Sequence, residues 1–426
     1  MRAELAGKTC SKRIVIATLG SLGDLHPCLA LALELQRRGH LVTIAATPYY
    51  RAKVEAAEVK FHPIRPDWDP TDRELIRQCE DLKRGPEVLL RKLILPELKD
   101  TYEDLLSAAT GADLMIAGEL VFAAPLVAEK LKLRWVSAIL SPCSFFSSSD
   151  PSVLVNVPWL IYLRRFGSPA YRAGLSVCRI GTRHWWTPVR NLRSESGLSS
   201  RCDPVFRDKF SPDLVLALFS GVLAATQLDW PSQTRQPGFV FFDKESTDNS
   251  ISTELTAFLS AGDRPIVFTQ GSTAVHNPGD FYEISAKAAK RLGRRAVLIG
   301  KKASDERRSQ EIFELPYASY SKIFPKAAVI VHQGGSGTTG QAMRAGRPML
   351  VVPYGWDQPD NASRVQRLGV GLHLSRSKYS VETAVAALER LLGDSKFGMR
   401  AVEAAARMQD EYGLTSACDA IESLVN

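Results

Sequence analysis

The chain has 426 residues, of which 45% are hydrophobic and 23% charged, and 54 lysines and arginines against 46 acidic residues give a formal net charge of +8. This composition indicates a folded protein of two or three domains and excludes disordered, collagen-like and disulfide-scaffold chains. Because no run of about 18 apolar residues occurs, we expect no helix that spans a membrane. The first residues, MRAELAGKTCSKR, lack the apolar core of a secretory signal, so we expect a cytoplasmic protein.

The distribution of basic residues and cysteines excludes further classes. The basic residues are scattered, which argues against nucleic-acid binding. Solubility, a phosphate-bearing small ligand or an anionic membrane surface remains as the reason for the surplus. None of the seven cysteines forms a Cys-x-x-Cys pair, so reduced thiols are expected rather than disulfides or a metal site.

Apolar runs alternate with amphipathic stretches along the first half of the chain, as in a parallel sheet covered by helices. A strand is expected over 13–18, followed by a glycine-rich turn (GSLGDLHP), an amphipathic helix that stops at Gly39, and a strand over 41–46. Further strands are expected over 113–117, 134–140 and 213–219. This order predicts a Rossmann-like domain over 1–230.

An insertion over about 141–210 is rich in aromatic residues, and we expect it to line a pocket above the sheet. Within it, the stretch WLIYLRRF over 159–166 mixes aromatic side chains with two arginines. A pocket lid or a plain amphipathic helix is the favoured interpretation. Weak contact with a membrane surface is the alternative.

A second alternating series follows a polar stretch over 228–250, which is expected to be a linker. Its strands are expected over 265–269, 296–299, 327–331, 348–352 and 369–374. They predict a second Rossmann-like domain over 240–405. The last stretch, 397–424, is helical in period, and a final helix over 406–426 is expected beyond this domain. The sequence thus predicts an α/β protein whose two parallel sheets face each other across a cleft, with ligands at the carboxyl ends of the strands.

The sequence HQGGSGTTG, from His332 to Gly340, follows one of these strands and opens a helix. Its glycines let the backbone approach a ligand, and the exposed amides at a helix start attract phosphate. Gly335 to Gly340 also fit the G-x-G-x-x-G pattern of dinucleotide folds, with Asp357 about 20 residues further on. An NAD-dependent oxidoreductase is therefore an alternative, although Asp357 lies beyond the expected ribose-binding strand end.

The sequence PYGWDQPDN lies at the end of the next strand and the start of the next helix. Asp357 and Gln358 side by side can hydrogen-bond neighbouring hydroxyls, such as those of a sugar. Asp360 is expected to cap the helix.

Together, HQGGSGTTGQAMRAGRPMLVVPYGWDQPDNA and the earlier GSLGDLHP resemble the signatures of nucleotide-sugar-dependent family 1 glycosyltransferases of the bacterial type, which act on sterols, macrolides, glycopeptide aglycones and flavonoids. The resemblance covers essentially the whole chain. It implies the GT-B fold, with an acceptor-binding first domain, a nucleotide-sugar-binding second domain, and a last helix that crosses back to the first domain.

The resemblance also implies roles for single residues. His332 and the helix start would hold the donor diphosphate, Asp357 and Gln358 the sugar, and the loop at Tyr317 the base. The implied donor-binding residues are Ser272, Tyr317, Ala318, His332, Gly335, Ser336, Gly337, Thr338, Asp357 and Gln358. Phe145 and Trp356 are the candidates for acceptor binding. No metal and no cofactor besides the nucleotide sugar is implied.

The catalytic base is open between two residues. Relatives often carry a histidine that deprotonates the acceptor hydroxyl where this chain has Asp24, and His26 lies two residues further on. A helix start lowers the pKa of a carboxylate, which weakens it as a base, whereas it keeps a histidine neutral. We favour Asp24, keep His26 as the alternative, and expect Glu119 to orient the base.

The sequence therefore predicts an inverting transfer of a sugar, with UDP-glucose the favoured donor, to a hydroxyl of an apolar phenolic, sterol or macrolide acceptor, giving a β-glycoside. The departing diphosphate would be stabilised by the helix amides. A non-catalytic nucleotide-sugar-binding protein and a sugar-nucleotide epimerase are rival interpretations. Neither the acceptor, the choice of uracil or thymine, nor the oligomeric state follows from the sequence.

Overall fold

The structure is a computed structural model that describes residues 11–243, 252–301 and 311–425. Most of the stretch on which the expected lack of a secretory signal rests, and part of the expected linker, lie outside the described residues. No helix in the described part of the chain is long and apolar enough to cross a membrane.

The first sheet has seven parallel strands in the order β3-β2-β1-β4-β5-β6-β7. Along β1, Ile14 and Ile16 enter the apolar cluster on one face, whereas Val15 and Ala17 enter the cluster on the other face. Successive side chains of a strand alternate between faces, so a sheet covered on both sides needs apolar residues at every position. The strands are β1 Arg13–Ala17, β2 Leu41–Ala46, β3 Lys60–Pro63, β4 Leu114–Gly118, β5 Trp135–Ile139, β6 Leu214–Ala217 and β7 Thr234–Arg235.

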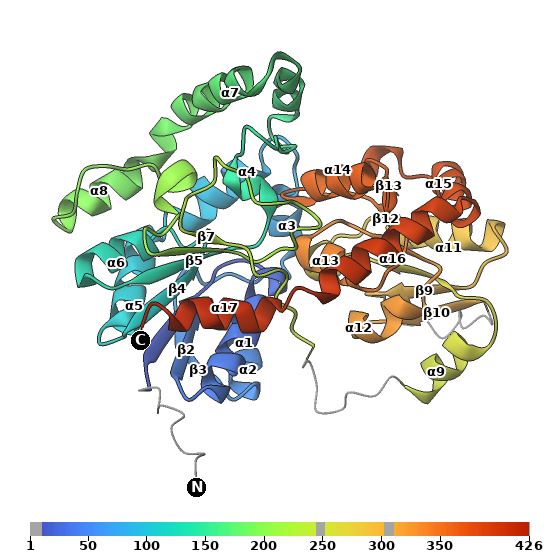
Figure 1. Cartoon of the computed structure of the whole chain (residues 1–426), viewed down its shortest axis with the longest axis horizontal. Coiled ribbons are helices and arrows are strands. Elements are labelled where there is room, and N and C mark those ends of the chain that lie inside the picture. The colour runs from blue at the N-terminus through green and yellow to red at the C-terminus, as the bar shows by residue number, and fades with distance from the viewer. Residues whose placement is uncertain (1–10, 244–251, 302–310, 426) are drawn as a thin grey trace, which may run out of the picture.

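Helices cover both faces of this sheet (Figure 1). They are α1 Leu22–Arg37, η1 Pro48–Tyr50, α2 Arg51–Ala56, α3 Arg73–Cys79, α4 Gly85–Glu87, η2 Val88–Ile94, α5 Leu98–Ala109 and α6 Ala124–Leu131. The insertion expected at 141–210 is mostly helical, with η3 Pro142–Phe145, η4 Pro158–Phe166, α7 Ser168–Gly181, η5 Arg183–Trp186, α8 Thr187–Glu195 and η6 Pro204–Asp208.

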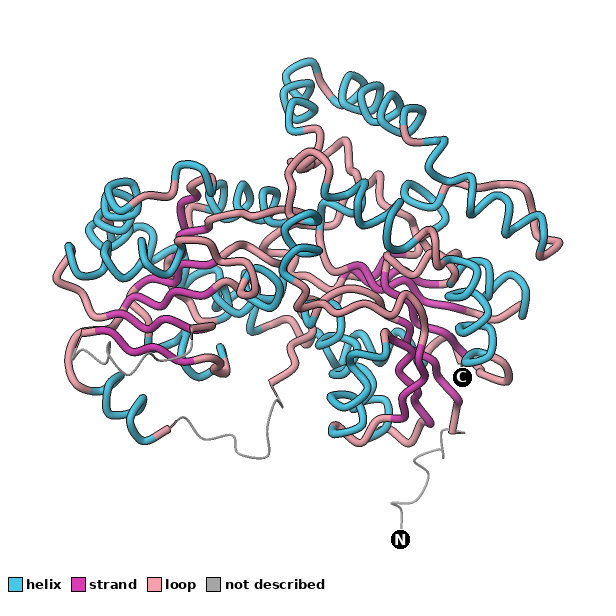
Figure 2. Tube along the Cα trace, turned by 180° about the vertical axis from the view of Figure 1, so that it is seen from behind, coloured by secondary structure: helices cyan, strands magenta, loops and turns pink. Residues whose placement is uncertain are grey.

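The second sheet has six parallel strands in the order β10-β9-β8-β11-β12-β13. They are β8 Ile266–Thr269, β9 Ala296–Ile299, β10 Ile312–Leu315, β11 Val329–His332, β12 Met349–Val351 and β13 Gly371–His373. Its helices are α9 Thr253–Ser260, α10 Gly271–Ala274, α11 Phe281–Arg291, α12 Tyr320–Ile323, η7 Phe324–Lys326, α13 Ser336–Arg344, α14 Gln358–Leu368, η8 Arg376–Lys378 and α15 Val381–Gly393. Seen from behind, the strands form two separate groups (Figure 2).

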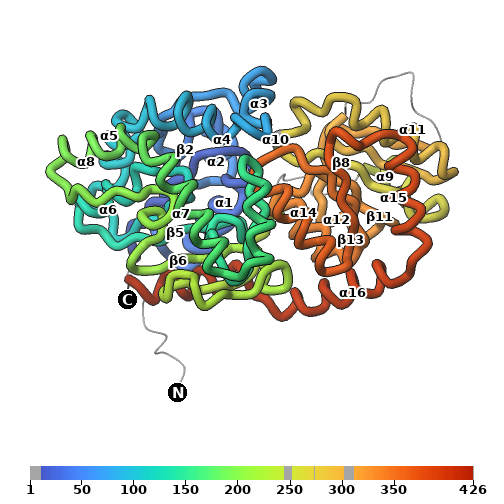
Figure 3. The backbone as a smooth tube through the Cα atoms, turned by 90° about the horizontal axis from the view of Figure 1, so that it is seen from above, coloured from blue at the N-terminus to red at the C-terminus, as the bar shows by residue number. Residues whose placement is uncertain are grey.

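Two helices end the chain where the sequence predicts one long helical stretch. α16 (Ser395–Gln409) packs on α13, and α17 (Gly413–Glu422) packs on α1 of the first domain. Arg38, at the end of α1, stabilises the packing of α17 on the first domain, because its guanidinium pairs with Asp419 and Glu422 at 2.6 Å each. Seen from above, this last stretch of the chain runs along both domains (Figure 3).

The prediction of two Rossmann-like domains with parallel sheets is confirmed. Three short edge strands were not predicted from the sequence: β3, β7 and β10. β7 extends the first sheet to Arg235, past the boundary expected at 230.

Candidate functional site

The carboxyl ends of the strands in the two sheets face each other, and two hydroxyl contacts join them. The Ser336 hydroxyl, at the start of α13, donates to the Leu140 carbonyl of the first domain at 2.5 Å. The Ser272 hydroxyl, in α10, lies 3.4 Å from the Ser21 hydroxyl, just before α1. The first turns of α1, α10 and α13 therefore meet in one cleft.

Asp24 occupies the first turn of α1. Its Oδ2 atom accepts hydrogen bonds from the Ser21 backbone N–H at 2.7 Å and from the Ser21 hydroxyl at 3.2 Å, which completes a capping box. Burial raises the pKa of Asp24 to about 6, and the nearby Glu119 carboxylate adds to the rise, although the bonds from Ser21 lower it. The helix start was expected to lower this pKa. Burial outweighs this effect, because removing the ionised carboxylate from water raises its pKa by more than the hydrogen bonds of the helix cap lower it.

His26 lies on another side of α1. Positions two apart on a helix point in nearly opposite directions. The imidazole packs on the Phe242 ring with a centroid separation of 5.3 Å. The structure thus does not bring His26 together with Asp24 and Glu119.

Glu119 follows β4 and has two partners. The Ser144 hydroxyl donates to its Oε1 atom at 2.9 Å, and the Lys209 ammonium lies 3.2 Å from its Oε2 atom. The Lys209 side chain is only 5% exposed. Its ammonium also lies over the Phe146 and Phe210 rings, at 4.9 and 5.2 Å from their centroids. Lys209 was not predicted from the sequence, because it belongs to no recognisable motif and only the fold brings it into contact with Glu119.

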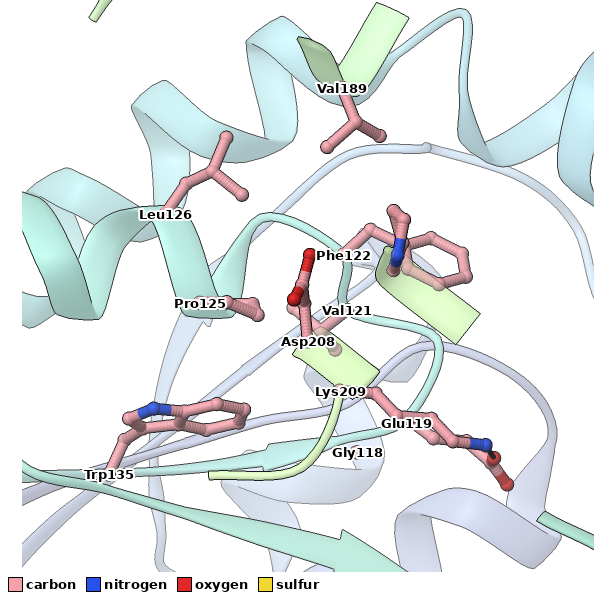
Figure 4. A pocket seen from close by; sticks show the side chains of 11 residues that line it. Gly118, Glu119, Val121, Phe122, Pro125, Leu126, Trp135, Val189, Asp208 and Lys209 are labelled. Carbon is pink, nitrogen blue, oxygen red and sulfur yellow. Dashed lines mark hydrogen bonds and ion pairs between the residues drawn. The ribbon is translucent and has the colours of Figure 1, made fainter. Parts of the chain in front are cut away.

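Two small pockets meet at Glu119. The Asp24 pocket opens at the carboxyl ends of the first sheet and is lined by Thr18, Leu19, Asp24, Pro27, Cys28, Gly118, Glu119, Ala138, Leu140 and Leu218. The Trp135 pocket shares Gly118 and Glu119 with it, and its lining, shown in Figure 4, also includes Phe122, Leu126, Trp135, Val189 and Lys209. Because most of this lining is apolar, a ligand that reaches Asp24 would rest on apolar walls.

The loop before α13 exposes backbone amides to the cleft. α13 begins at Ser336, and no side chain caps it. A Cβ atom added at Gly337 would have no neighbour within 4 Å, so the backbone there faces open space. Thr338 is buried, and the Ser336 hydroxyl is taken by Leu140. An anion at this helix start would therefore be held chiefly by N–H groups and the helix dipole.

His332 lies deeper in the fold than a diphosphate contact requires. The imidazole is fully buried, its Nδ1 accepts the Gly334 N–H at 3.0 Å, and its Nε2 lies 3.5 Å from the Met349 sulfur. Burial lowers its pKa to about 3, which keeps the ring neutral. Because both ring nitrogens are directed at protein atoms, His332 supports the glycine loop in this structure and does not point at the place expected for a diphosphate.

Asp357 immediately precedes α14, and Gln358 is the first residue of that helix. The Asn361 amide, one helical turn on, donates to the Asp357 Oδ2 atom at 2.8 Å. Burial raises the pKa of Asp357 to about 7, and the carboxylates of Asp24 and Glu119 raise it further. Gln358, predicted to hold sugar hydroxyls, uses its side-chain oxygen to accept the N–H groups of Tyr354 and Gly355. Asp357 is thus the member of the pair that faces the first domain.

Three buried amide oxygens near these loops have no protein partner in the described structure: those of Gln270, Gln333 and Asn361. The Gln333 side chain lies against Gly271, where an added Cβ atom would be 2.0 Å from its Nε2. The Asn361 amide also donates to the Gly334 carbonyl at 2.9 Å. Buried polar atoms in native proteins are normally paired, so these unpaired acceptors beside the glycine loops are candidates for bonding a polar ligand. The spacing of Asn361 four residues after Asp357 could have revealed it in the sequence.

The remaining predicted contacts divide between the surface and the core. Tyr317 is 57% exposed, and Ala318 packs against the second domain's apolar core. Phe145, predicted to bind the acceptor, is buried in an aromatic stack and lies 4.0 Å, centroid to centroid, from Trp230. Trp356 has a φ of 59° and packs partly against the first domain's core. The structure thus makes Phe145 a core residue and leaves Trp356 at the junction of the domains.

Known proteins resemble the chain along nearly its whole length. Family models described as "Glycosyltransferase family 28 N-terminal domain" and "Erythromycin biosynthesis protein CIII-like, C-terminal domain" match residues 14–142 and 310–419. O-mycaminosyltylonolide 6-deoxyallosyltransferase of Streptomyces fradiae is 30% identical over 96% of this chain and 97% of its own. Sterol 3-beta-glucosyltransferase of Aspergillus clavatus is 27% identical over 96% of this chain, which spans 30% of that protein.

Solved structures share the fold. That of the glycosyltransferase VinC in complex with DTDP has a TM-score of 0.67 and 18% identity, covering 97% of this chain and 99% of that one. Family membership also removes the NAD-dependent oxidoreductase from the alternatives. The two facing parallel sheets, the two family models and the near full-length relative together place the chain among the family 1-type glycosyltransferases of GT-B fold.

Proposed function

We propose that the protein transfers a hexose from a pyrimidine nucleoside diphosphate sugar to a hydroxyl of an apolar natural product, with inversion at the anomeric carbon. The observation that carries this proposal is that one cleft holds Asp24 from the first domain, Asp357 from the second, and the exposed start of α13, with Asp24 near enough for its carboxylate to raise the pKa of Asp357. One carboxylate lies on the acceptor side and one on the donor side, and an anion-binding helix start completes the set.

Asp24 is the proposed general base. Both Ser21 hydrogen bonds reach its Oδ2 atom, so Oδ1 is the oxygen that can accept the proton of an acceptor hydroxyl in the Asp24 pocket. A carboxylate with a raised pKa is a stronger base than an ordinary aspartate and is still ionised near neutral pH. The hydroxyl oxygen then attacks the anomeric carbon while the diphosphate leaves towards the amides of Ser336, Gly337 and Thr338. A single displacement of this kind converts an α-linked donor to a β-glycoside.

The donor base and sugar are proposed from the relatives. The similar Streptomyces enzyme is named for a 6-deoxyallosyl transfer, and the VinC structure holds DTDP. A thymidine diphosphate deoxysugar is therefore our first candidate for the donor. UDP-glucose, which the sequence favours, is the second, because the fungal relative is named a glucosyltransferase. The acceptor class proposed is a macrolide, with sterols and phenols as the alternatives to test.

The direct test has two parts. Mass spectrometry of reactions that combine thymidine diphosphate sugars or UDP-glucose with macrolides, sterols and phenols should show a product heavier by one sugar. NMR of that product should show the β linkage. Nucleotide binding without any product under all combinations would instead favour a non-catalytic binding protein, and loss of donor in the absence of acceptor would favour an epimerase.

A pair of variants tests the phosphate site. Gly337→Asp introduces a carboxylate at the start of α13, where the added Cβ has free space, so donor affinity should fall at least about tenfold through charge repulsion. Gly337→Ala adds the same Cβ without the charge and is the matched control. Calorimetric titration with thymidine diphosphate and UDP measures both. Equal affinities in the two variants would refute the assignment of the diphosphate to this helix start.

A further inference from the structure

The segment of residues 158–181, here called the arm, stands outside the two sheets. It consists of η4 and α7, which pack against each other at the top of the molecule (Figure 1). Leu160, Tyr171 and Leu175 form a small core of its own. A Cβ atom added at Gly174 would lie 2.4 Å from a Leu160 methyl, so the two helices are in close contact. The arm is thus a built element with a defined outer face.

The exposed surface of the arm, here called its outer face, is unusually rich in large apolar side chains. Trp159, Tyr162 and Phe166 of η4 are 50%, 61% and 76% exposed, and Val177 and Ile180 of α7 are 64% and 72% exposed. Among the described residues, these are five of the thirteen large hydrophobic side chains that are exposed. Singly exposed apolar residues are common on proteins, but a group of large ones marks an interaction surface.

The charge of this region has one sign. From Pro151 to Ser194 the sequence contains seven arginines, no lysine and no acidic residue. Of the arginines on the arm and its flank, Arg179 pairs with Asp203, whereas Arg164, Arg165 and Arg172 have no ion-pair partner among the described residues. Arg164 and Arg165 are exposed beside the aromatic residues, and the Arg165 guanidinium lies 5.7 Å from the centre of the Tyr162 ring. Exposed aromatic and cationic groups therefore share one surface.

We infer that the outer face of the arm docks on an anionic lipid bilayer. Tryptophan, tyrosine and phenylalanine insert at the level of the headgroups, and arginine next to them reaches the lipid phosphates, which is the pattern of interfacial membrane-binding helices. A second copy of the chain fits less well, because a two-fold interface would press this arginine face against itself. This inference does not depend on the proposed reaction.

The test is binding of the full chain to vesicles. We expect the protein to sediment with vesicles of phosphatidylcholine mixed with phosphatidylglycerol and to stay in solution with phosphatidylcholine alone. Each arginine near an anionic surface contributes about fivefold to binding, so the double variant Arg164→Glu, Arg165→Glu should bind at least about 20-fold more weakly. Trp159→Ala with Phe166→Ala should weaken binding about tenfold through lost insertion.

Matched changes on α16 are the controls. Lys396→Glu with Arg400→Glu makes the same change of charge, and Met399→Ala with Val402→Ala removes exposed apolar groups of that helix, which lies away from the arm. Neither control should alter vesicle binding, and thermal unfolding shows that each variant is folded. Equal losses in arm and control variants, or no binding of the unaltered protein to anionic vesicles, would overturn the inference. A dimer in light scattering that the arm variants dissolve would also overturn it, because the face would then be an interface between copies.

Discussion

The raised pKa of Asp24 leads to a quantitative prediction for the pH dependence of turnover. A base must be ionised to accept a proton, so kcat/KM should follow the ionised fraction of Asp24. With a pKa of about 6, that fraction is about 90% at pH 7 and about 10% at pH 5, so kcat/KM should fall roughly tenfold between these values. An aspartate at the ordinary value of 3.8 would lose almost nothing over this range.

A second perturbation tests the cause of the shift. The Glu119 carboxylate raises the pKa of Asp24 by charge repulsion, so Glu119→Gln should move the acidic limb of the profile to lower pH. If Glu119 only supported the fold, its loss would lower kcat at all pH values and leave the limb in place. Glu389→Gln changes an exposed residue of α15 in the same way and should leave the profile unaltered.

The assay measures initial rates of product formation between pH 5 and pH 8 at low acceptor concentration. Chromatography quantifies the product. Asp24→Asn should lower kcat by at least about 10²-fold and remove the limb, while the affinity for the nucleotide is kept. A flat wild-type profile, or a limb that persists in Asp24→Asn, would refute the role of Asp24 as base. Wild-type turnover in Asp24→Asn with a loss in His26→Ala would move that role to His26.

Two further predictions concern stability. Burial raises the pKa of Asp357 to about 7, so the stability contributed by its neutral form is fully present below about pH 4 and is lost as the pH rises through 7. The melting temperature of the wild type should therefore fall more between pH 5 and pH 7 than that of Asp357→Asn. Parallel melting curves for the two proteins would contradict the raised pKa. Arg364→Met leaves the buried Asp360 carboxylate, 2.7 Å from the guanidinium, without its partner and should lower the free energy of unfolding by about 3–5 kcal/mol in urea titrations. The exposed Arg367, changed in the same way, should cost no more than about 1 kcal/mol, and similar losses in both variants would count against a buried ion pair.

Local pattern was enough to predict the fold. Strands such as β2 and β9 were predicted with the bounds that the structure shows, because a buried parallel strand is a short, continuous apolar run. Edge strands were missed because they carry a weaker signal: β7 has only two residues, and β10 has no fully buried residue. The final helical stretch was predicted as one piece because its period continues across the break before α17.

The candidate site was only partly predictable. Motifs identified the start of α13 and the carboxyl group of Asp357 as candidates, since glycine loops and helix starts are formed by adjacent residues. The direction in which each side chain points could not be predicted from these motifs. His332 turns inward to its own loop, Gln358 caps a backbone turn, and Phe145 joins an aromatic core.

Interactions between charged groups that are distant in sequence could be identified only from the folded structure. Lys209 contacts Glu119 across 90 residues of sequence, and the Asp24 carboxylate raises the pKa of Asp357 in the other domain. The pKa of a group depends on burial and on charges brought near it in space, and neither quantity is encoded in neighbouring residues. Sequence period and turn chemistry are local, and they specify the two sheets and their loops. Packing joins distant segments, and it set the ionisation of Asp24 and the exposure of the arm.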